Sequence, residues 1–316
     1  YGASVNLEAN PITGYHFTSW SGTYNTGSFT MPADNVSMTA NGTANTYYIV
    51  YNGNGANSGS MGTTTCTYGQ SCSLLNLGYS KLGYHFTSWT GSNGGYYSNG
   101  QNVTNLTTTN GATITMNANW KGNTYYIAYN GNGATSGRVG ITTCTYGVPC
   151  ELRANGFSRT GYTFSGWNTA SGFIMVCGTN KVCNLTTTNG GTVNLYANWT
   201  VNQYKVTVNK GTGITSVDGG GTYNYGASVN LGATPITGYH FTSWSGTYNT
   251  GSFTMPAEDV TMTANGTANT YTVKYNANGG TGTMNDTACT YDKNCTLRAN
   301  SFSKPGNTFN GWTSSK

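Results

Sequence analysis

The chain repeats itself almost verbatim. Residues 1–47 read YGASVNLEANPITGYHFTSWSGTYNTGSFTMPADNVSMTANGTANTY, and residues 225–271 return the same text with a handful of substitutions. A second repeat lies within that interval, because NTYYIVYNGNGANSG at 45–59 returns as NTYYIAYNGNGATSG at 123–137. Repeats of this kind indicate a tandem array of small units rather than one large domain.

Two module types, A and B, account for these repeats. The sequence predicts a partial A module at 1–44 (module 1), B modules at 45–122 (module 2) and 123–200 (module 3), an A module at 201–268 (module 4) and a partial B module at 269–316 (module 5). Both ends fall inside a module. We therefore expect these residues to be a window on a longer A-B-B-A-B-B polypeptide.

The composition limits the class of protein. Hydrophobic residues make up 36% of the chain and charged residues only 7%, and no apolar run approaches the length of a membrane span. A net charge of +5, carried by scattered basic residues, is too small for a nucleic-acid-binding surface. We expect an extracellular β protein that amides and hydroxyls keep soluble, with no nucleic-acid partner and no membrane insertion in this segment.

The eight cysteines form four pairs, and each pair brackets five residues. Three pairs occupy the same place in successive B modules, as CTYGQSC, CTYGVPC and CTYDKNC, where the central residues form a turn between short strands. Zinc would need four converging ligands, usually from closer doublets. The spacing therefore predicts disulfides in an oxidising compartment and no metal site, joining Cys66 to Cys72, Cys144 to Cys150, Cys177 to Cys183 and Cys289 to Cys295.

Short alternating segments dominate the rest of the chain. TITMNANW at 113–120 and TVNLYANW at 192–199 place apolar side chains on one face, as half-buried strands do. Asn-Gly pairs supply the tight turns, and no stretch of ten residues has helical periodicity. We expect a mainly β chain with at most one short helical turn per module, near Val103 to Thr109 or Val182 to Thr188.

Aromatic residues fall into two groups. A Gly-Tyr-x-Phe-x-x-Trp segment, with Asn for Tyr in its last copy, recurs in every module, and this favours a role as a core anchor over a carbohydrate platform. It begins at Gly14, Gly83, Gly161, Gly238 and Gly306. Extra tyrosines lie outside the motif in Gly-rich turns, and we expect these to be exposed and available for an interface: Tyr24, Tyr96, Tyr97, Tyr223 and Tyr248.

The B modules resemble the Listeria-Bacteroides repeat, also called the InlB B-repeat, of bacterial surface proteins. The resemblance is carried by YTVKYNANGG at 271–280, RTGYTFSGW at 159–167 and TNGGTVNLYANW at 188–199. The A modules resemble its shorter, divergent relative through GYHFTSW and FTMPADNVSMTA at 29–40. The resemblance implies compact β-grasp-like modules strung along secreted or wall-attached proteins, often adhesins. The cysteine pairs are not part of the usual pattern.

Catalytic chemistry finds no support in the sequence. His16, His85 and His240 occupy one position of the aromatic motif, and threonine replaces histidine there in other modules. The adjacent acids Glu258 and Asp259 correspond to an Asp-Asn pair in module 1, so no pair of carboxylates is maintained for acid–base work. No catalytic motif occurs. We expect no enzyme activity and no cofactor.

Glycosylation sequons occur throughout the chain, although many arise by chance in a sequence this rich in Asn and Thr. The candidate acceptors are Asn35, Asn41, Asn102, Asn105, Asn184, Asn198, Asn265, Asn285 and Asn294.

Repetition favours a structural function. We expect an elongated, beads-on-a-string array on the cell surface, acting as a stalk or a fibre segment that serves adhesion or surface architecture. Its partners would be neighbouring repeats and other copies of itself in a fibre. The alternative is a set of ligand-binding adhesin modules that recognise a glycan or a cell-surface protein through the turn tyrosines, with avidity from many weak sites.

Overall fold

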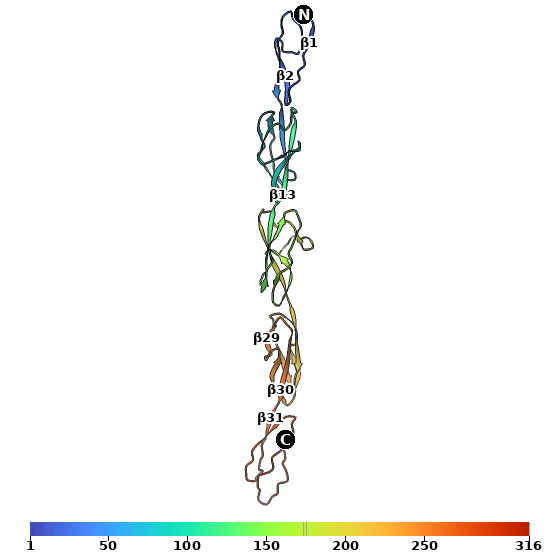
Figure 1. Ribbon diagram of the computed structural model, residues 1–316. Helices are drawn as coiled ribbons and strands as arrows, with labels where there is room; N and C mark the ends of the chain where they lie inside the picture. Colours follow the sequence, from blue (N-terminus) through green and yellow to red (C-terminus); the bar gives the residue numbers. More distant parts are fainter. Residues whose placement is uncertain (173, 175, 316) are drawn as a thin grey trace. The chain divides into compact units, whose positions relative to one another are not determined.

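The computed structural model describes residues 1–172, 174 and 176–315, and within these residues the regular elements are all strands (Figure 1). Two compact units are present, one of residues 1–130, 138–156 and 167–196, the other of residues 131–137, 157–166 and 197–316. The predicted helical turns at 103–109 and 182–188 are absent from these segments. Asn105 and Asn184 there have φ of +56° and +52°, which a right-handed helix does not accept.

Module 2 has one principal sheet. Its strand order is β7-β5-β13-β10, with β5 (Thr46–Asn52) and β13 (Thr113–Gly122) parallel at the centre. The outer strands β7 (Thr64–Thr67) and β10 (Tyr84–Gly91) are antiparallel to their neighbours, and β11 (Tyr96–Tyr97) continues the sheet beyond β10. Two short pairs complete the module, β6 (Ser58–Gly59) with β9 (Tyr79–Ser80) and β8 (Cys72–Ser73) with β12 (Asn102–Val103).

Module 3 repeats this order as β16-β14-β22-β19, with β14 (Thr124–Asn130) and β22 (Thr192–Val201) parallel at the centre. The other strands are β15 (Ser136–Gly137), β16 (Thr142–Thr145), β17 (Cys150–Glu151), β18 (Phe157–Ser158), β19 (Tyr162–Asn168), β20 (Val176–Gly178) and β21 (Lys181–Val182).

Module 4 has the order β25-β23-β30-β28, again with a central parallel pair, β23 (Gln203–Lys210) and β30 (Val260–Ala268). Its other strands are β24 (Ile214–Asp218), β25 (Gly221–Asn224), β26 (Ser228–Asn230), β27 (Gly232–Pro235), β28 (Tyr239–Gly246) and β29 (Ser252–Thr254). The A and B types therefore share one topology.

Modules 1 and 5 show parts of the same plan. Module 1 contains β1 (Ser4–Asn6), β2 (Tyr15–Gly22), β3 (Ser28–Thr30) and β4 (Met38–Ala44), with β2 antiparallel to β4. Module 5 contains the antiparallel pair β31 (Thr270–Val273) and β32 (Thr287–Thr290).

A β-bulge explains the Phe-x-x-Trp spacing of the aromatic motif. Residues three apart on a regular strand face opposite sides. The pairing of β10 with β13 shifts register between Phe86 and Ser88. Phe86 and Trp89 therefore lie on the same face, with their ring centroids 4.9 Å apart. Trp89 is fully buried with Tyr47, Ile49 and other residues of the module 2 core. The phenylalanine and tryptophan of the motif therefore anchor the core of module 2 as predicted.

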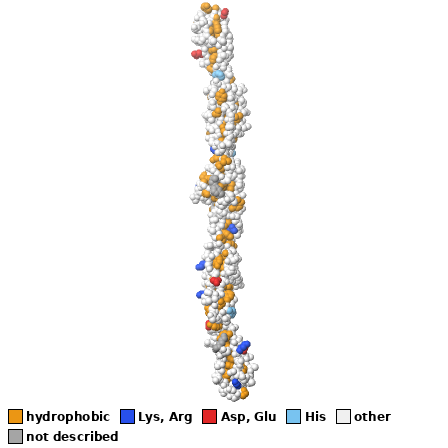
Figure 2. Space-filling model, turned by 180° about the vertical axis from the view of Figure 1, so that it is seen from behind, with side chains coloured by type: hydrophobic (Ala, Val, Ile, Leu, Met, Phe, Trp, Pro, Cys, Tyr) orange, Lys and Arg blue, Asp and Glu red, His pale blue; other side chains and the backbone are white. Residues whose placement is uncertain are grey.

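The surface is mostly uncharged. Figure 2 shows a face dominated by polar side chains and backbone, with few charged groups. Within the described residues, Lys181 and Glu151 form an ion pair between two exposed side chains, with 3.4 Å between Nζ and Oε1. Such a pair contributes little to stability.

Candidate inter-module interface

Consecutive modules are joined by one asparagine. β4 ends at Ala44 and β5 begins at Thr46, so Asn45 alone links modules 1 and 2. The same single-residue link recurs at Asn123, Asn202 and Asn269. The last strand of one module thus runs almost directly into the first strand of the next.

Asn45 binds both of the modules that it joins. Its backbone N–H donates to the carbonyl of Gly14 (2.8 Å), and its Oδ1 lies 2.7 Å from Nδ1 of His16, both in module 1. Its Nδ2 donates to the carbonyl of Thr108 (2.7 Å), and its own carbonyl accepts from the N–H of Tyr68 (2.8 Å), both in module 2. All four polar groups of this residue therefore have partners, as a buried amide requires.

Asn123 repeats the arrangement between modules 2 and 3. Its partners are Gly83 (2.8 Å), His85 (2.9 Å), Thr187 (2.7 Å) and Tyr146 (2.8 Å), through the same four groups. Asn45 and Asn123 are 5% and 7% exposed, and no other polar residue in the described part of the chain is buried to this degree. The buried polar positions of the protein thus coincide with its module junctions.

The histidine of the aromatic motif acts as a hydrogen-bond donor. Because Nδ2 of Asn45 donates to a carbonyl, its Oδ1 must accept, and His16 therefore carries a proton on Nδ1. In the third junction the Oγ1 of Thr163 donates to Oδ1 of Asn202 at 2.6 Å. A hydroxyl can replace the imidazole because the position needs only a donor. This requirement explains the His/Thr exchange seen in the sequence.

The backbone bonds of the junction recur in the other two copies. The N–H of Asn202 donates to Gly161 (2.9 Å), and its carbonyl accepts from Tyr225 (2.9 Å). Asn269 makes the corresponding bonds to Gly238 (2.8 Å) and Tyr291 (2.9 Å). The A-to-B, B-to-B and B-to-A junctions are therefore built alike.

A glycine and two tyrosines complete each junction. Gly83 has φ of +77°, and a Cβ there would lie 2.4 Å from the ring of Tyr146. Glycine is therefore required both by the backbone and by the ring that covers it. The ring of Tyr84 meets Tyr146 edge-to-face, with centroids 5.5 Å apart. The corresponding sets are Gly14, Tyr15 and Tyr68; Gly161, Tyr162 and Tyr225; and Gly238, Tyr239 and Tyr291.

The motif tyrosine thus differs in role from the motif tryptophan. We expected all three aromatic residues of the segment to anchor the module core. The structure places Phe86 and Trp89 there, whereas Tyr84 precedes the bulge and contacts the next module. Tyr84 therefore belongs to the junction and not to the core, where the motif predicts it.

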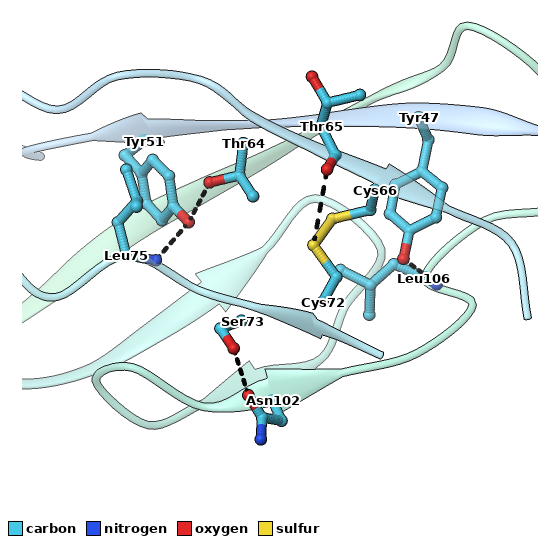
Figure 3. The surroundings of a disulfide bond; sticks show 10 residues. All are labelled: Tyr47, Tyr51, Thr64, Thr65, Cys66, Cys72, Ser73, Leu75, Asn102 and Leu106. Carbon is cyan, nitrogen blue, oxygen red and sulfur yellow. Dashed lines mark hydrogen bonds between the residues drawn. A yellow bond between two sulfur atoms is a disulfide. The ribbon is translucent and has the colours of Figure 1, made fainter. Parts of the chain in front are cut away.

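Disulfides enclose the junction tyrosine in the B modules. Cys66 and Cys72 are joined in the structure (Figure 3), and the loop that they close contains Tyr68. Tyr51 supports the same hairpin, because its hydroxyl is 3.1 Å from Oγ1 of Thr64 and accepts from the N–H of Leu75 (2.8 Å). The bonds Cys144–Cys150 and Cys289–Cys295 enclose Tyr146 and Tyr291 in the same way, and Cys177–Cys183 closes a separate loop of module 3.

The predicted interface tyrosines are less exposed than expected. Tyr96 is 76% exposed, but Tyr97 packs against the module 2 core. Tyr24 stacks on a phenylalanine of module 1, and Tyr223 and Tyr248 pack against the module 4 core. The ring of Tyr97 lies against Gly91 and Gly95, where a Cβ would collide with it. The exposure on which the interface hypothesis depends is found at Tyr96.

The candidate glycosylation sites fall into two groups. Asn41, Asn184, Asn198 and Asn265 are half-buried, and Asn35, Asn102, Asn105, Asn285 and Asn294 are exposed. In the half-buried group, Nδ2 of Asn41 and of Asn265, the atom that a glycan would modify, already donates to serines of the neighbouring strand. The exposed group therefore offers the more accessible acceptors.

Other kinds of site are not indicated. Among the described residues, no three His, Cys, Asp or Glu side chains lie together as metal ligands would. The same residues include no helix with the length and apolar character of a membrane span.

Comparison with known families decides the classification. The model of the divergent InlB B-repeat domain matches residues 1–46, 48–124 and 204–270, which is more than half of the chain. The chain belongs to this family. The Listeria-Bacteroides repeat domain matches residues 125–198 and 271–316. Both InlB B-repeat families are typically non-enzymatic modules of surface proteins, and together with the disulfides they indicate an extracellular or surface protein.

Module 2 connects the two InlB B-repeat families. It resembles module 3 in the sequence and shares its cysteine hairpin, yet it matches the divergent model. A protein of Evansella cellulosilytica, described as a Gly-rich membrane protein, is 28% identical to this chain over 257 residues. The match covers 74% of this chain and 28% of the relative. This chain thus spans little more than a quarter of that relative. A solved structure of the Bacillus anthracis TIE protein aligns over 80% of this chain and 57% of its own, at 9% identity and a TM-score of 0.28.

Sequence reasoning missed the junction residues of these InlB B-repeats. The available signal was an asparagine, followed after one residue by tyrosine, at every module boundary: Asn45, Asn123, Asn202 and Asn269. This residue stays the same in both module types although its flanks differ, which is expected of a side chain that both modules bind.

Proposed function

We propose that this chain is a stalk segment of a long extracellular surface protein, in which the modules set a distance between the cell and a more distal functional part. The observation that carries the proposal is the junction asparagine. A one-residue link that is hydrogen-bonded to both modules leaves few backbone angles free, in contrast to a Gly/Ser linker. The relative's description as a membrane protein and the disulfides agree with a place at the cell surface.

Small-angle X-ray scattering on the whole chain tests this proposal. A compact globule of this length would have a radius of gyration of about 20 Å. Five modules of about 30 Å placed end to end would instead have a radius of gyration of roughly 40 Å. The matched control carries a short Gly/Ser insertion after Asn202, which should lower the radius of gyration. A value near that of the globule, or no response to the insertion, would reject a stalk.

Adhesion by the modules themselves is the second candidate, and among the predicted interface tyrosines it is favoured by the exposed Tyr96. The partner would be a glycan or a cell-surface protein. Tyr96→Ser tests it without disturbing the core, whereas Tyr97→Ser would also remove packing. Binding of the chain to a glycan array that Tyr96→Ser abolishes, at unchanged thermal stability, would support adhesion. Binding that survives the substitution would remove Tyr96 as the contact residue, and no binding by the unchanged chain would remove a glycan as the partner.

A further inference from the structure

The first and last strands of modules 2, 3 and 4 are neighbours in the sheet and run parallel. In module 2 the pair is β5 and β13, with Tyr48 opposite Thr113 and Asn52 opposite Asn117. Modules 3 and 4 pair β14 with β22 and β23 with β30 in the same way. We call each of these the terminal strand pair.

Parallel pairing determines how tension acts on a module. The chain enters β5 at Thr46 and leaves β13 at Gly122, and these residues lie at opposite ends of a parallel pair. Pulling on the two links therefore slides the strands along their own axes. All hydrogen bonds between the strands must then fail together. In an antiparallel hairpin pulled at its open end, the bonds would fail one after another.

Additional bonds extend the terminal strand pair where the chain enters the module. The N–H of Thr46 donates to Oδ1 of Asn110 (3.0 Å), and its carbonyl accepts from the N–H of Gly111 (2.8 Å). Tyr48 N–H also donates to the carbonyl of Ala112 at 2.8 Å.

The other modules repeat this extension. In module 3, Thr124 is bonded to Asn189 and Gly190. In module 4, Oδ1 of Asp259 accepts from the N–H of Lys205 at 2.8 Å. The acceptor of module 4 acts two residues further along the first strand, because Lys205 corresponds to Tyr48 of module 2 and not to Thr46.

One face of the terminal strand pair is closed to water. Ile49, Met116 and Ala118 are fully buried in the core of module 2, and each strand of the pair has a further strand on its other side. From this face, water cannot easily replace the inter-strand bonds one by one during stretching.

The disulfides lie outside this path. Cys66 is on β7 and Cys72 on β8, and the bond closes only a short loop, with a sequence separation of 6. Force passing from Thr46 to Gly122 through the terminal strand pair does not cross it. The disulfide therefore protects the hairpin without bypassing the strand pair.

From this geometry we infer that each complete module is a tension-bearing element, which resists force through its terminal strand pair and releases a fixed length of chain when the pair fails. The physiological meaning of this function rests on the proposed stalk. The mechanical property itself is a consequence of the strand order, and it is tested independently of the shape of the chain.

Single-molecule stretching of the whole chain, held at its two ends, is the test. We expect modules 2, 3 and 4 to open in single steps on the order of 200 Å each, at about 3.5 Å per residue. Reductant assigns the steps to modules. It should lengthen the step of module 2 by roughly 20 Å and the step of module 3, which has two disulfides, by roughly 40 Å. The step of module 4, which has no disulfide, should not change.

Two matched substitutions in module 2 identify the terminal strand pair as the barrier. Asn110→Ala removes an acceptor that extends the pair, whereas Asn99→Ala removes the acceptor of the Leu77 N–H, a bond of the same kind away from the pair. At constant force, Asn110→Ala should shorten the lifetime of folded module 2 roughly fivefold. Asn99→Ala should leave this lifetime unchanged, and neither variant should affect module 4.

Equal effects of the two substitutions would overturn the inference, and so would opening through several small steps. Asn189→Ala provides a repeat in module 3 if the module 2 variant fails to fold, which would show as a missing step. The outcome is distinguishable from failure of the stalk. A flexible chain would give a small radius of gyration in scattering and still show the unfolding steps, whereas a weak strand pair would leave the scattering unchanged.

Discussion

Module 2 and module 4 have the same strand order and the same junctions, but they hold the hairpin next to the first strand by different chemistry. Module 2 joins Cys66 to Cys72 and adds the hydroxyl of Tyr51, which bonds to both sides of the hairpin. Module 4 has no cysteine, and Val208 stands where module 2 has Tyr51. Module 4 thus lacks both the disulfide and a counterpart of the Tyr51 hydroxyl.

Apolar packing takes their place in module 4. The corresponding loop continues into β26, which pairs with β29 over three residues, whereas β8 pairs with β12 over two. Val229 on β26 and Met255 next to β29 are each 1% exposed. Backbone bonds between Gly226 and Met255 (3.0 Å) and between Met255 and Ala227 (2.8 Å) fix the loop that carries the junction tyrosine. The difference shows that the junction needs a fixed loop but not a disulfide.

The largest expected effect compares the motif tryptophans. Trp89 is fully buried in module 2, whereas Trp244 is half-buried against the module 4 core. Trp89→Ala should destabilise module 2 by about 3–5 kcal/mol, and Trp244→Ala should cost module 4 about 2 kcal/mol. Hydrogen exchange with peptide resolution reports each module separately. Equal losses would show that the two cores depend on this residue to the same extent.

Alanine at the junction glycine is expected to have the next largest effect. Gly83→Ala introduces backbone strain and a contact with the ring of Tyr146, and together these should cost about 2–4 kcal/mol. Gly161→Ala should cost less, because no disulfide restrains Tyr225. Gly94→Ala is the control, since Gly94 has φ of +84° and open space around it, so that only strain remains. The comparison fails if all three variants lose the same protection in hydrogen exchange.

Reduction of the disulfides should produce a smaller difference in stability between the two module types. Opening a loop as short as that of Cys66 and Cys72 removes about 2 kcal/mol in the chain-entropy model. We expect this loss in module 2 and no change in module 4, measured as denaturant midpoints before and after reduction. If reduction destabilised module 4 to the same extent, the stabilities of neighbouring modules would be coupled through the junctions.

The smallest expected effect concerns the tyrosine hydroxyl. Tyr51→Phe keeps the ring and leaves the N–H of Leu75 without its partner, at a cost of about 1 kcal/mol. Tyr129→Phe should do the same in module 3, where the hydroxyl accepts from Arg153 N–H at 3.0 Å. In oxidised protein the disulfide should mask part of this effect, and in reduced protein the full cost should be measured by chemical denaturation. A cost independent of redox state would contradict this coupling.

Much of the fold was predictable because its signals are local. Alternation in TITMNANW marks β13, equal cysteine spacing marks the hairpins, and the repeats themselves mark the modules. The exposure of adjacent tyrosines was not predicted correctly. Tyr96 and Tyr97 lie on a strand rather than in a turn, so they face opposite sides and only Tyr97 reaches the core.

The junction was not predictable from any single module. Its glycine and histidine come from one module and its tyrosine from the next, with an interval of more than fifty residues between Gly14 and Tyr68. The Phe-x-x-Trp spacing was equally uninformative without knowledge of the bulge between Phe86 and Ser88. In both cases the missing information was the pairing of strands, which hydrophobic periodicity does not contain.

The identical junctions have an evolutionary consequence. Because Asn45, Asn123 and Asn202 make the same backbone contacts whether an A or a B module follows, either type can succeed the other without new interface residues. A gene that encodes such an array can gain or lose whole units by recombination between its own repeats, and each product retains complementary neighbours. The length of the protein is thus open to selection in steps of one module, while the sequence of each unit stays constant.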